Sequence, residues 1–239
     1  MRTSNITRKV MQFDKFRMIP TDEMIRGEKI AAPGTEIPLQ VKELIEEAKS
    51  LYLEYADPKG VMADISINDF SGIFNSSELN DIDPVLENIY PEADHLSLFV
   101  LTSGSDVCEK IESLSHNGNM AAGYMLDIIT SLATDGLVSE IETMIEKKKQ
   151  TEYNDDLRTL SYSPGYCGWH LSVQKPIFDF LKPSDISVTL SDSFLMSPIK
   201  AVSGVLVSGY KNIHYFSECT FEYCKDCRTI SCRDRMDNL

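Results

Sequence analysis

The chain has 239 residues, of which 42% are hydrophobic and 25% charged, an ordinary globular composition with enough length for a sizeable core. Its net charge of −14 repels phosphate backbones and anionic lipid, so we expect neither nucleic acid nor a membrane as partner. No apolar run reaches the roughly 18 residues that span a bilayer, and the N-terminus lacks an apolar signal core. We therefore expect a cytoplasmic protein, where six cysteines favour metal or redox chemistry over disulfides.

The first half of the chain predicts a mixture of helices and strands. A short helical turn capped by Thr21 precedes a helix over 39–56, where apolar residues recur at helical spacing. Alternation predicts a strand over 61–67, and residues 69–82 resemble a loop. The apolar run 95–104, bounded by turn residues, predicts a buried strand.

The second half contains the longest helical pattern of the chain. A helix with a polar end is expected over 106–119, followed by a long helix over 120–150 whose first half is apolar nearly all round and therefore buried. Residues 171–181 predict a helix broken at Pro176, and 186–209 predict two or three short strands separated by Gly and Ser. Helices and strands mix without strict alternation, which predicts a single α+β domain.

The strongest local signal is a cysteine-rich tail. Cys224 and Cys227 have the two-residue gap that lets a tight turn present two thiolates to one ion, and Cys219 and Cys232 flank them symmetrically. Four thiolates suit zinc or an iron–sulfur cluster, and the spacing does not choose between them. Free thiols are the alternative interpretation of the same pattern.

Two further stretches have an unusual composition. SYSPGYCGWH (161–170) gathers two tyrosines and the only tryptophan around a Pro-Gly turn, where Gly165 permits a positive φ or the close approach of a ligand. SDSFLMSPIKAVSG (191–204) carries small residues suited to a strand edge beside a flat cofactor. By residue type alone, core packing explains the aromatic residues slightly better than ligand binding, and a tight turn explains the second stretch.

Familiar catalytic motifs are missing from the sequence. The four histidines, His95, His116, His170 and His214, share no metal-ligand spacing with one another. The chain also has no triad signature, P-loop or dinucleotide-binding glycine motif. The residues leave open whether the chain is an enzyme.

Two stretches in this order resemble the reactivation domain of cobalamin-dependent methionine synthase. Residues 163–181 are similar to a family segment in which a Pro-Gly-Tyr turn precedes a helix, and 191–204 match the pattern Ser-Phe-x-Met-x-Pro-x-x-x-Val-Ser-Gly. The tail resembles that of stand-alone relatives, Cys-x2-Cys-x4-Cys-x2-Arg, from Cys224 to Arg235. The resemblance covers mainly 120–235 and implies an α+β fold with a twisted, mostly antiparallel sheet and packed helices.

The resemblance divides the chain and implies a function. It implies an activation-like domain over 1–216, followed by the metal-binding tail over 217–239. The domain would bind S-adenosylmethionine and act as a stand-alone reactivation subunit on a partner, a corrinoid-carrying methyltransferase or methionine synthase core. There, one-electron reduction of cob(II)alamin is drawn forward by irreversible methylation. The chain lacks the base-off motif Asp-x-His-x-x-Gly, so we expect cobalamin on the partner.

The resemblance also implies a set of ligand-binding residues. Ser163 and Gly165 would offer backbone groups to S-adenosylmethionine, and Tyr166 would contact it. The acidic residue of the family's long helix falls on Asp135, which would meet the ammonium of the ligand.

Two family positions remain, one before the Pro-Gly-Tyr turn and one after the Ser-Gly strand. The family's tyrosine after the Ser-Gly strand falls at His214 or Tyr215. Ser161 stands where the family has an arginine that clamps the ligand's carboxylate. This departure favours a second hypothesis, a non-catalytic module that docks on a corrinoid protein and carries a structural or redox metal site.

Overall fold

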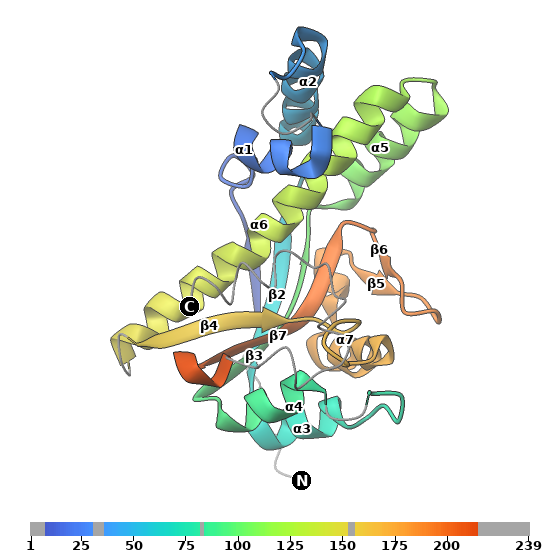
Figure 1. The fold of residues 1–239 in the computed structure, drawn as a ribbon. Coiled ribbons are helices and arrows are strands. Elements are labelled where there is room, and N and C mark those ends of the chain that lie inside the picture. The colour runs from blue at the N-terminus through green and yellow to red at the C-terminus, as the bar shows by residue number, and fades with distance from the viewer. Residues whose placement is uncertain (1–7, 31–35, 82–83, 153–155, 215–239) are drawn as a thin grey trace.

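A five-stranded antiparallel sheet organises the chain, as Figure 1 shows for the computed structural model, which describes residues 8–30, 36–81, 84–152 and 156–214. Every neighbouring pair in the order β1-β2-β3-β7-β4 is antiparallel, and helices cover both faces, so the expected α+β class is confirmed. The strands are β1 (Arg8–Gln12), β2 (Lys59–Ile65), β3 (His95–Thr102), β4 (Leu157–Tyr162) and β7 (Ala201–Tyr210), and a separate hairpin pairs β5 (Thr189–Leu190) with β6 (Met196–Ser197).

The helices form two groups, one on each face of the sheet. None of the helices in the described residues is long and apolar enough to cross a membrane. The first face carries α1 (Asp22–Ile25), the π-helical turn η1 (Arg26–Ile30), α2 (Leu39–Tyr55), α5 (Ser105–His116) and α6 (Met120–Glu152). The second face carries α3 (Ile67–Phe74), α4 (Val85–Ile89) and α7 (Gln174–Leu181), with short 3-10 turns η2 (Tyr90–Glu92), η3 (Leu171–Val173), η4 (Pro183–Ile186) and η5 (Lys211–His214).

Helix α6 is the central helix on the first face of the sheet. Its 33 residues run diagonally across the sheet in Figure 1, with α2 and α5 packed against its N-terminal half. The core here joins α2 and α6 to the alternate residues of the central strands that face them, among them Phe99 and Leu206. The long helix expected over 120–150 is therefore confirmed as a central element.

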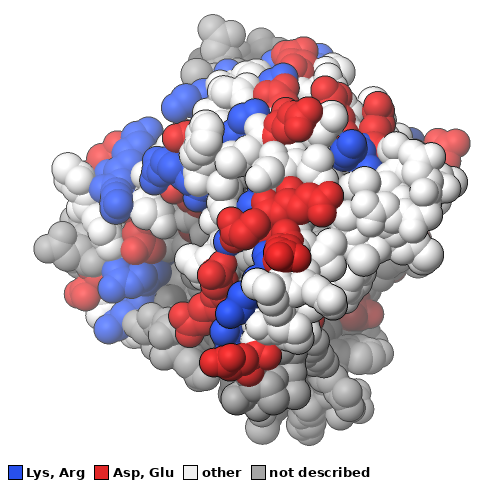
Figure 2. All heavy atoms as spheres, turned by 90° about the horizontal axis from the view of Figure 1, so that it is seen from above, with Lys and Arg blue, Asp and Glu red and all other residues white. Residues whose placement is uncertain are grey.

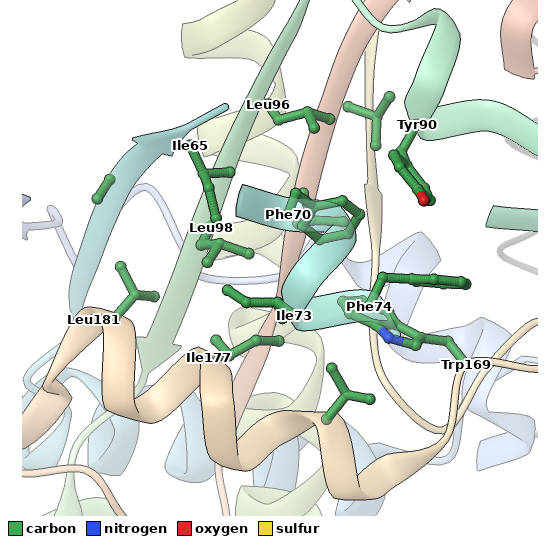
Figure 3. Packing of buried hydrophobic residues seen from close by; sticks show 14 of the residues in the cluster. Ile65, Phe70, Ile73, Phe74, Tyr90, Leu96, Leu98, Trp169, Ile177 and Leu181 are labelled. Carbon is green, nitrogen blue, oxygen red and sulfur yellow. The ribbon is translucent and has the colours of Figure 1, made fainter. Parts of the chain in front are cut away.

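An aromatic cluster holds the second layer together. Trp169 is 1% exposed, its ring stacks on Phe74 at 6.0 Å between centroids, and it meets the edge of Phe70 at 5.8 Å. Tyr90 packs edge-on against Phe70 at 5.1 Å. Figure 3 shows Phe70 and Phe74 on α3, with Tyr90 on one side and Trp169 on the side of α7, beside the apolar residues of the sheet. The only tryptophan of the chain is therefore a core residue.

Two predictions were wrong and two elements were not predicted. The break expected at Pro176 is absent, because Pro176 lies in the first turn of α7, which runs on to Leu181, and neither α4 nor β4 was predicted. Residues 69–82 were expected to be loop, but α3 begins at Ile67 because the Ser66 hydroxyl accepts the backbone N–H of Asp69 at 3.1 Å. Its apolar residues Phe70 and Phe74 lie one turn apart and face the core, a short helical pattern hidden among Ser, Asn and Asp. Strand β4 escaped prediction because two of its three buried residues, Thr159 and Ser161, are polar, so its sequence shows no apolar alternation.

Charged side chains cover the helical end of the molecule. Figure 2 shows Asp and Glu in a band across this face, with most of the visible Lys and Arg to one side of the band and a few within it. Such a mixed surface gives no continuous basic track on this face, in line with the acidic composition.

A polar cluster interrupts the first layer where α6 nears its C-terminal end. The Ser97 hydroxyl donates to the Asp64 carboxylate at 2.7 Å, and His95 Nε2 lies 3.1 Å from the same oxygen. The hydrogen bond from His95, outweighing burial, is the main reason that the pKa of Asp64 is lowered to about 2. One imidazole nitrogen serves both Asp64 and Ser97, so the three residues do not form a catalytic triad.

We predict that this cluster makes stability depend on pH in the acid range. Because the pKa of Asp64 is lower in the folded chain than its ordinary value of 3.8, its contribution is complete above about pH 4 and lost as the pH falls toward 2. Urea unfolding across this range should show the advantage of the wild type over Asp64→Asn shrinking as pH falls. The control is Asp192→Asn, at an exposed residue. A constant difference between wild type and Asp64→Asn would contradict the assignment.

The aromatic cluster yields a second prediction. Truncation of Trp169 to alanine should lower the free energy of unfolding by about 3–5 kcal/mol, because it removes a fully buried aromatic side chain and leaves a cavity. Truncation of Tyr166, which is 58% exposed three residues earlier, should change it by less than about 0.5 kcal/mol. Denaturant titration of both variants is the measurement, and similar losses for the two would refute the division of roles.

Candidate functional site

The candidate site begins where β4 leaves the sheet. The last pair of β4 with β7 joins Tyr162 to Val205, so residues 201–204 of β7 extend beyond it. The chain crosses directly over Gly204, where a Cβ atom would overlap the carbonyl oxygen of Tyr162 and press on the Ser163 hydroxyl. Only glycine allows this crossing, which places Ser163 at the edge of the sheet on the α6 face, near the ring of Phe99.

A tight loop follows the crossing. The Gly165 N–H donates to the carbonyl of Trp169 at 2.7 Å, and the Trp169 N–H donates to the carbonyl of Tyr166 at 3.0 Å. Three residues have positive φ, Gly165 at 93°, Cys167 at 53° and Gly168 at 77°. These hydrogen bonds and left-handed residues fold the loop back on itself, so Trp169 turns into the core while Tyr166 stays outside.

The segment after α3 anchors this loop through hydrogen bonds. The Asp81 N–H donates to the Gly168 carbonyl at 3.0 Å, and the His170 N–H donates to Asn80 Oδ1 at 2.9 Å. The Asn80 amide in turn donates to the carbonyl of Phe74 at 2.8 Å, which ties the loop to the end of α3. Tyr166 therefore projects from a loop that is fixed at several points.

Helix α6 covers the outer edge of β4. The Ser161 N–H donates to Glu142 Oε1 at 2.7 Å, and the Thr159 N–H donates to Glu146 Oε2 at 2.8 Å. Four helix residues rise about 6 Å and two strand residues span about 6.7 Å, so carboxylates four residues apart fit alternate N–H groups of an edge strand. Ser161 itself is buried and pairs with Leu206, so it lies on the α6 face of the sheet.

Asp135 lies on the same side of α6, two turns before Glu142. It is accessible to solvent, and within the described residues its carboxylate makes no hydrogen bond or ion pair. Partial removal from bulk water, followed by the charge of Glu28, raises its pKa, while Lys200 opposes the shift. An accessible carboxylate with no partner in an acidic setting favours a cationic ligand.

Lys200 lies beside the preceding turns of α6. It ends the segment between β6 and β7, and its Nζ donates to Ser131 Oγ at 2.7 Å and to Asp127 Oδ1 at 2.8 Å. Its side chain is 13% exposed. Lys200 falls at an unspecified position of the 191–204 pattern, so the sequence offered no signal for it beyond its charge.

His214 lies on the opposite face of the sheet. It is fully buried, its Nε2 donates to the Arg158 carbonyl at 3.3 Å, and its Nδ1 then accepts the hydroxyl of Tyr162 at 2.9 Å. Tyr162 pairs with Val205 and packs in the α3–α7 layer. The structure therefore brings Ser161, Ser163 and Asp135 to one face, whereas His214 lies behind the sheet.

The remaining predicted residues lie beyond the part of the chain that the structure describes. These are Tyr215 and the four tail cysteines Cys219, Cys224, Cys227 and Cys232. Within residues 8–214, apart from the gaps, no group of three or more His, Cys, Asp or Glu side chains could hold a metal ion.

Comparisons with known proteins agree with this architecture. The solved structures include a crystal structure of the MetH reactivation domain bound to AdoHcy, which matches with a TM-score of 0.62 at 12% identity and covers 86% of this chain and 79% of that one. At that identity the match shows a shared fold. A search of curated proteins found no match.

A family model decides the relationship. The model described as vitamin B12 dependent methionine synthase, activation domain, matches residues 79–226, more than half of the chain. The matched range includes α6, the crossing at Gly204 and the loop that carries Tyr166. The chain therefore belongs to the family of vitamin B12-dependent methionine synthase activation domains.

Proposed function

We propose that the chain binds S-adenosylmethionine between helix α6 and the loop after β4, and supports reductive methylation of cob(II)alamin on a partner protein. The observation that carries the proposal is Asp135, an accessible carboxylate that has no partner among the described residues, on the face of α6 toward which β4 ends. Membership of the activation-domain family and the fold shared with an AdoHcy-bound domain support it.

The residues present fit the chemistry of this ligand. S-adenosylmethionine carries an ammonium and a sulfonium, and Asp135 supplies the negative charge for the first. The exposed ring of Tyr166 offers a flat face that suits adenine stacking or a sulfonium. Because the Gly165 N–H is used by Trp169, the turn would contribute its carbonyl groups to the ligand.

The role of the chain in this function is positioning. When a corrinoid partner is bound, one-electron reduction followed by methyl transfer from S-adenosylmethionine supplies the chemistry, with an external one-electron donor. The residues of this chain hold the ligand's amino-acid end on α6 and its nucleoside end on the loop, which fixes the direction of the methyl group. Cobalamin would come with the partner, since this chain has no base-off motif.

We predict that two substitutions weaken binding of S-adenosylmethionine in calorimetric titration. Asp135→Asn should raise the Kd about 10- to 100-fold through loss of a charged hydrogen bond, and Tyr166→Ala about 10-fold through loss of a stacking face. Because the pKa of Asp135 is raised in the fold, its charge does not stabilise the native state at neutral pH. Asp135→Asn should therefore unfold at a denaturant concentration no lower than wild type does.

The matched control for Tyr166 is Tyr124, an exposed tyrosine near the start of α6. Tyr124→Ala should bind as wild type does. If wild type binds no S-adenosylmethionine at millimolar concentration, the methylation role fails, and the docking module becomes the better account. That account expects the chain to form a complex with a corrinoid protein whether or not S-adenosylmethionine is present.

We also propose that the tail cysteines bind a metal as zinc or an iron–sulfur cluster. Protein purified without oxygen should contain about one zinc ion or one cluster per chain by elemental analysis. Replacing Cys224 and Cys227 with serine should remove it, whereas Cys108→Ser, at a buried residue of α5, should retain it. Metal that survives the double substitution would contradict the assignment.

A further inference from the structure

The proposed ligand carries a carboxylate as well as two cationic groups, and this inference rests on the proposed function. The family's arginine for that carboxylate is replaced by Ser161. The Ser161 hydroxyl is neutral, and its N–H is already taken by Glu142 at 2.7 Å. A carboxylate near Ser161 would therefore gain no positive charge from that residue and would approach a glutamate.

Lys200 supplies a positive charge on the other side of Asp135. Its Nζ is fixed on Ser131, one turn before Asp135, or about 6 Å along the helix axis. Glu142, whose carboxylate accepts the Ser161 N–H, lies two turns after Asp135, or about 10 Å along the axis. Ser131, Asp135 and Glu142 share one side of α6. Lys200 therefore lies toward the N-terminal end of the helix from Asp135, and Ser161 lies toward the C-terminal end.

The chemistry of an α-amino acid favours the nearer of the two positions. Its ammonium and carboxylate are attached to the same carbon atom, so the groups that bind them must lie close together. Lys200 forms its ion pair with Asp127 and, within the described residues, none with Asp135. Its charge nevertheless acts on Asp135, since it opposes the rise in the pKa of that carboxyl. The two groups are thus near neighbours without contact, an arrangement into which a zwitterion fits.

The setting of Lys200 also makes it a defined binding group. The Ser131 hydroxyl and the Asp127 carboxylate take two of its three N–H groups and hold the ammonium in place. Within the part of the chain that the structure describes, the third N–H has no partner and can bind a ligand, and the side chain keeps part of its surface exposed. Holding the long side chain in advance lowers the entropy lost on binding.

We propose that Lys200 binds the carboxylate of S-adenosylmethionine in this chain, taking the part that an arginine at position 161 plays in the family. The carboxylate lies between Lys200 and Asp135, with the ammonium on Asp135. Lys200 is then a binding residue that selects ligands with an intact amino-acid end.

Calorimetric titration with two ligands tests the proposal. S-adenosylmethionine and its decarboxylated analogue differ only in the carboxylate. Lys200→Met, which keeps most of the side chain's length and removes the charge, should weaken binding of S-adenosylmethionine about 10- to 30-fold and leave binding of the analogue unchanged. Lys175→Met, at an exposed residue of α7 on the other face, should change neither affinity.

Each outcome bears on the inference in a different way. Unchanged S-adenosylmethionine affinity in Lys200→Met overturns the role of Lys200 while the proposed function stands. An equal loss for both ligands, with a lowered melting temperature, shows a structural role for Lys200 and also overturns it. If wild type binds neither ligand, the proposed function and the inference fail together.

Discussion

The close passage of the chain over Gly204 is the constraint on which the candidate site depends. The Tyr162 carbonyl lies where any side chain at position 204 would have to be, so β4 can end there and turn outward without disturbing β7. The loop that carries the aromatic residues starts at this crossing. Ser163 comes to the edge of the α6 face, Trp169 enters the α3–α7 core, and Tyr166 is left on the surface.

Helix α6 provides the second half of the site because one side of it meets several elements in turn. Asp127 and Ser131 bind the ammonium of Lys200, which directly precedes β7. Glu142 and Glu146 accept N–H groups at the outer edge of β4. Asp135 lies between these two contacts. The same helical repeat therefore stabilises both flanks of the site and leaves one carboxylate between them for a ligand.

The sequence carried enough information for the fold class and for most of the large elements. The helical repeat in 120–150 and the apolar run at 95–104 are strong periodic signals, and both are confirmed. The helix at Ile67–Phe74 was missed because it is short and polar residues surround its three core positions. In the stretch 161–170, composition alone could not tell the buried Trp169 from the exposed Tyr166, because three positive φ angles decide which ring turns inward.

The site was only partly visible in the sequence. The family pattern points to Asp135 and Tyr166 but leaves position 200 unspecified, so Lys200 emerges only from its contacts with α6. The pairing of Glu142 with Ser161 joins a helix and a strand that no sequence repeat connects. The roles of the tail cysteines and of Tyr215 stay predictions, since they lie outside the described residues.

The central claim is that α6 and the loop after β4 form one binding site for S-adenosylmethionine. A crystal structure of the protein with S-adenosylhomocysteine, which cannot donate a methyl group, tests it most directly. The account predicts the ligand's ammonium on the Asp135 carboxylate and its nucleoside beside Tyr166. Ligand density elsewhere on the molecule, or none at saturating concentration, would contradict it.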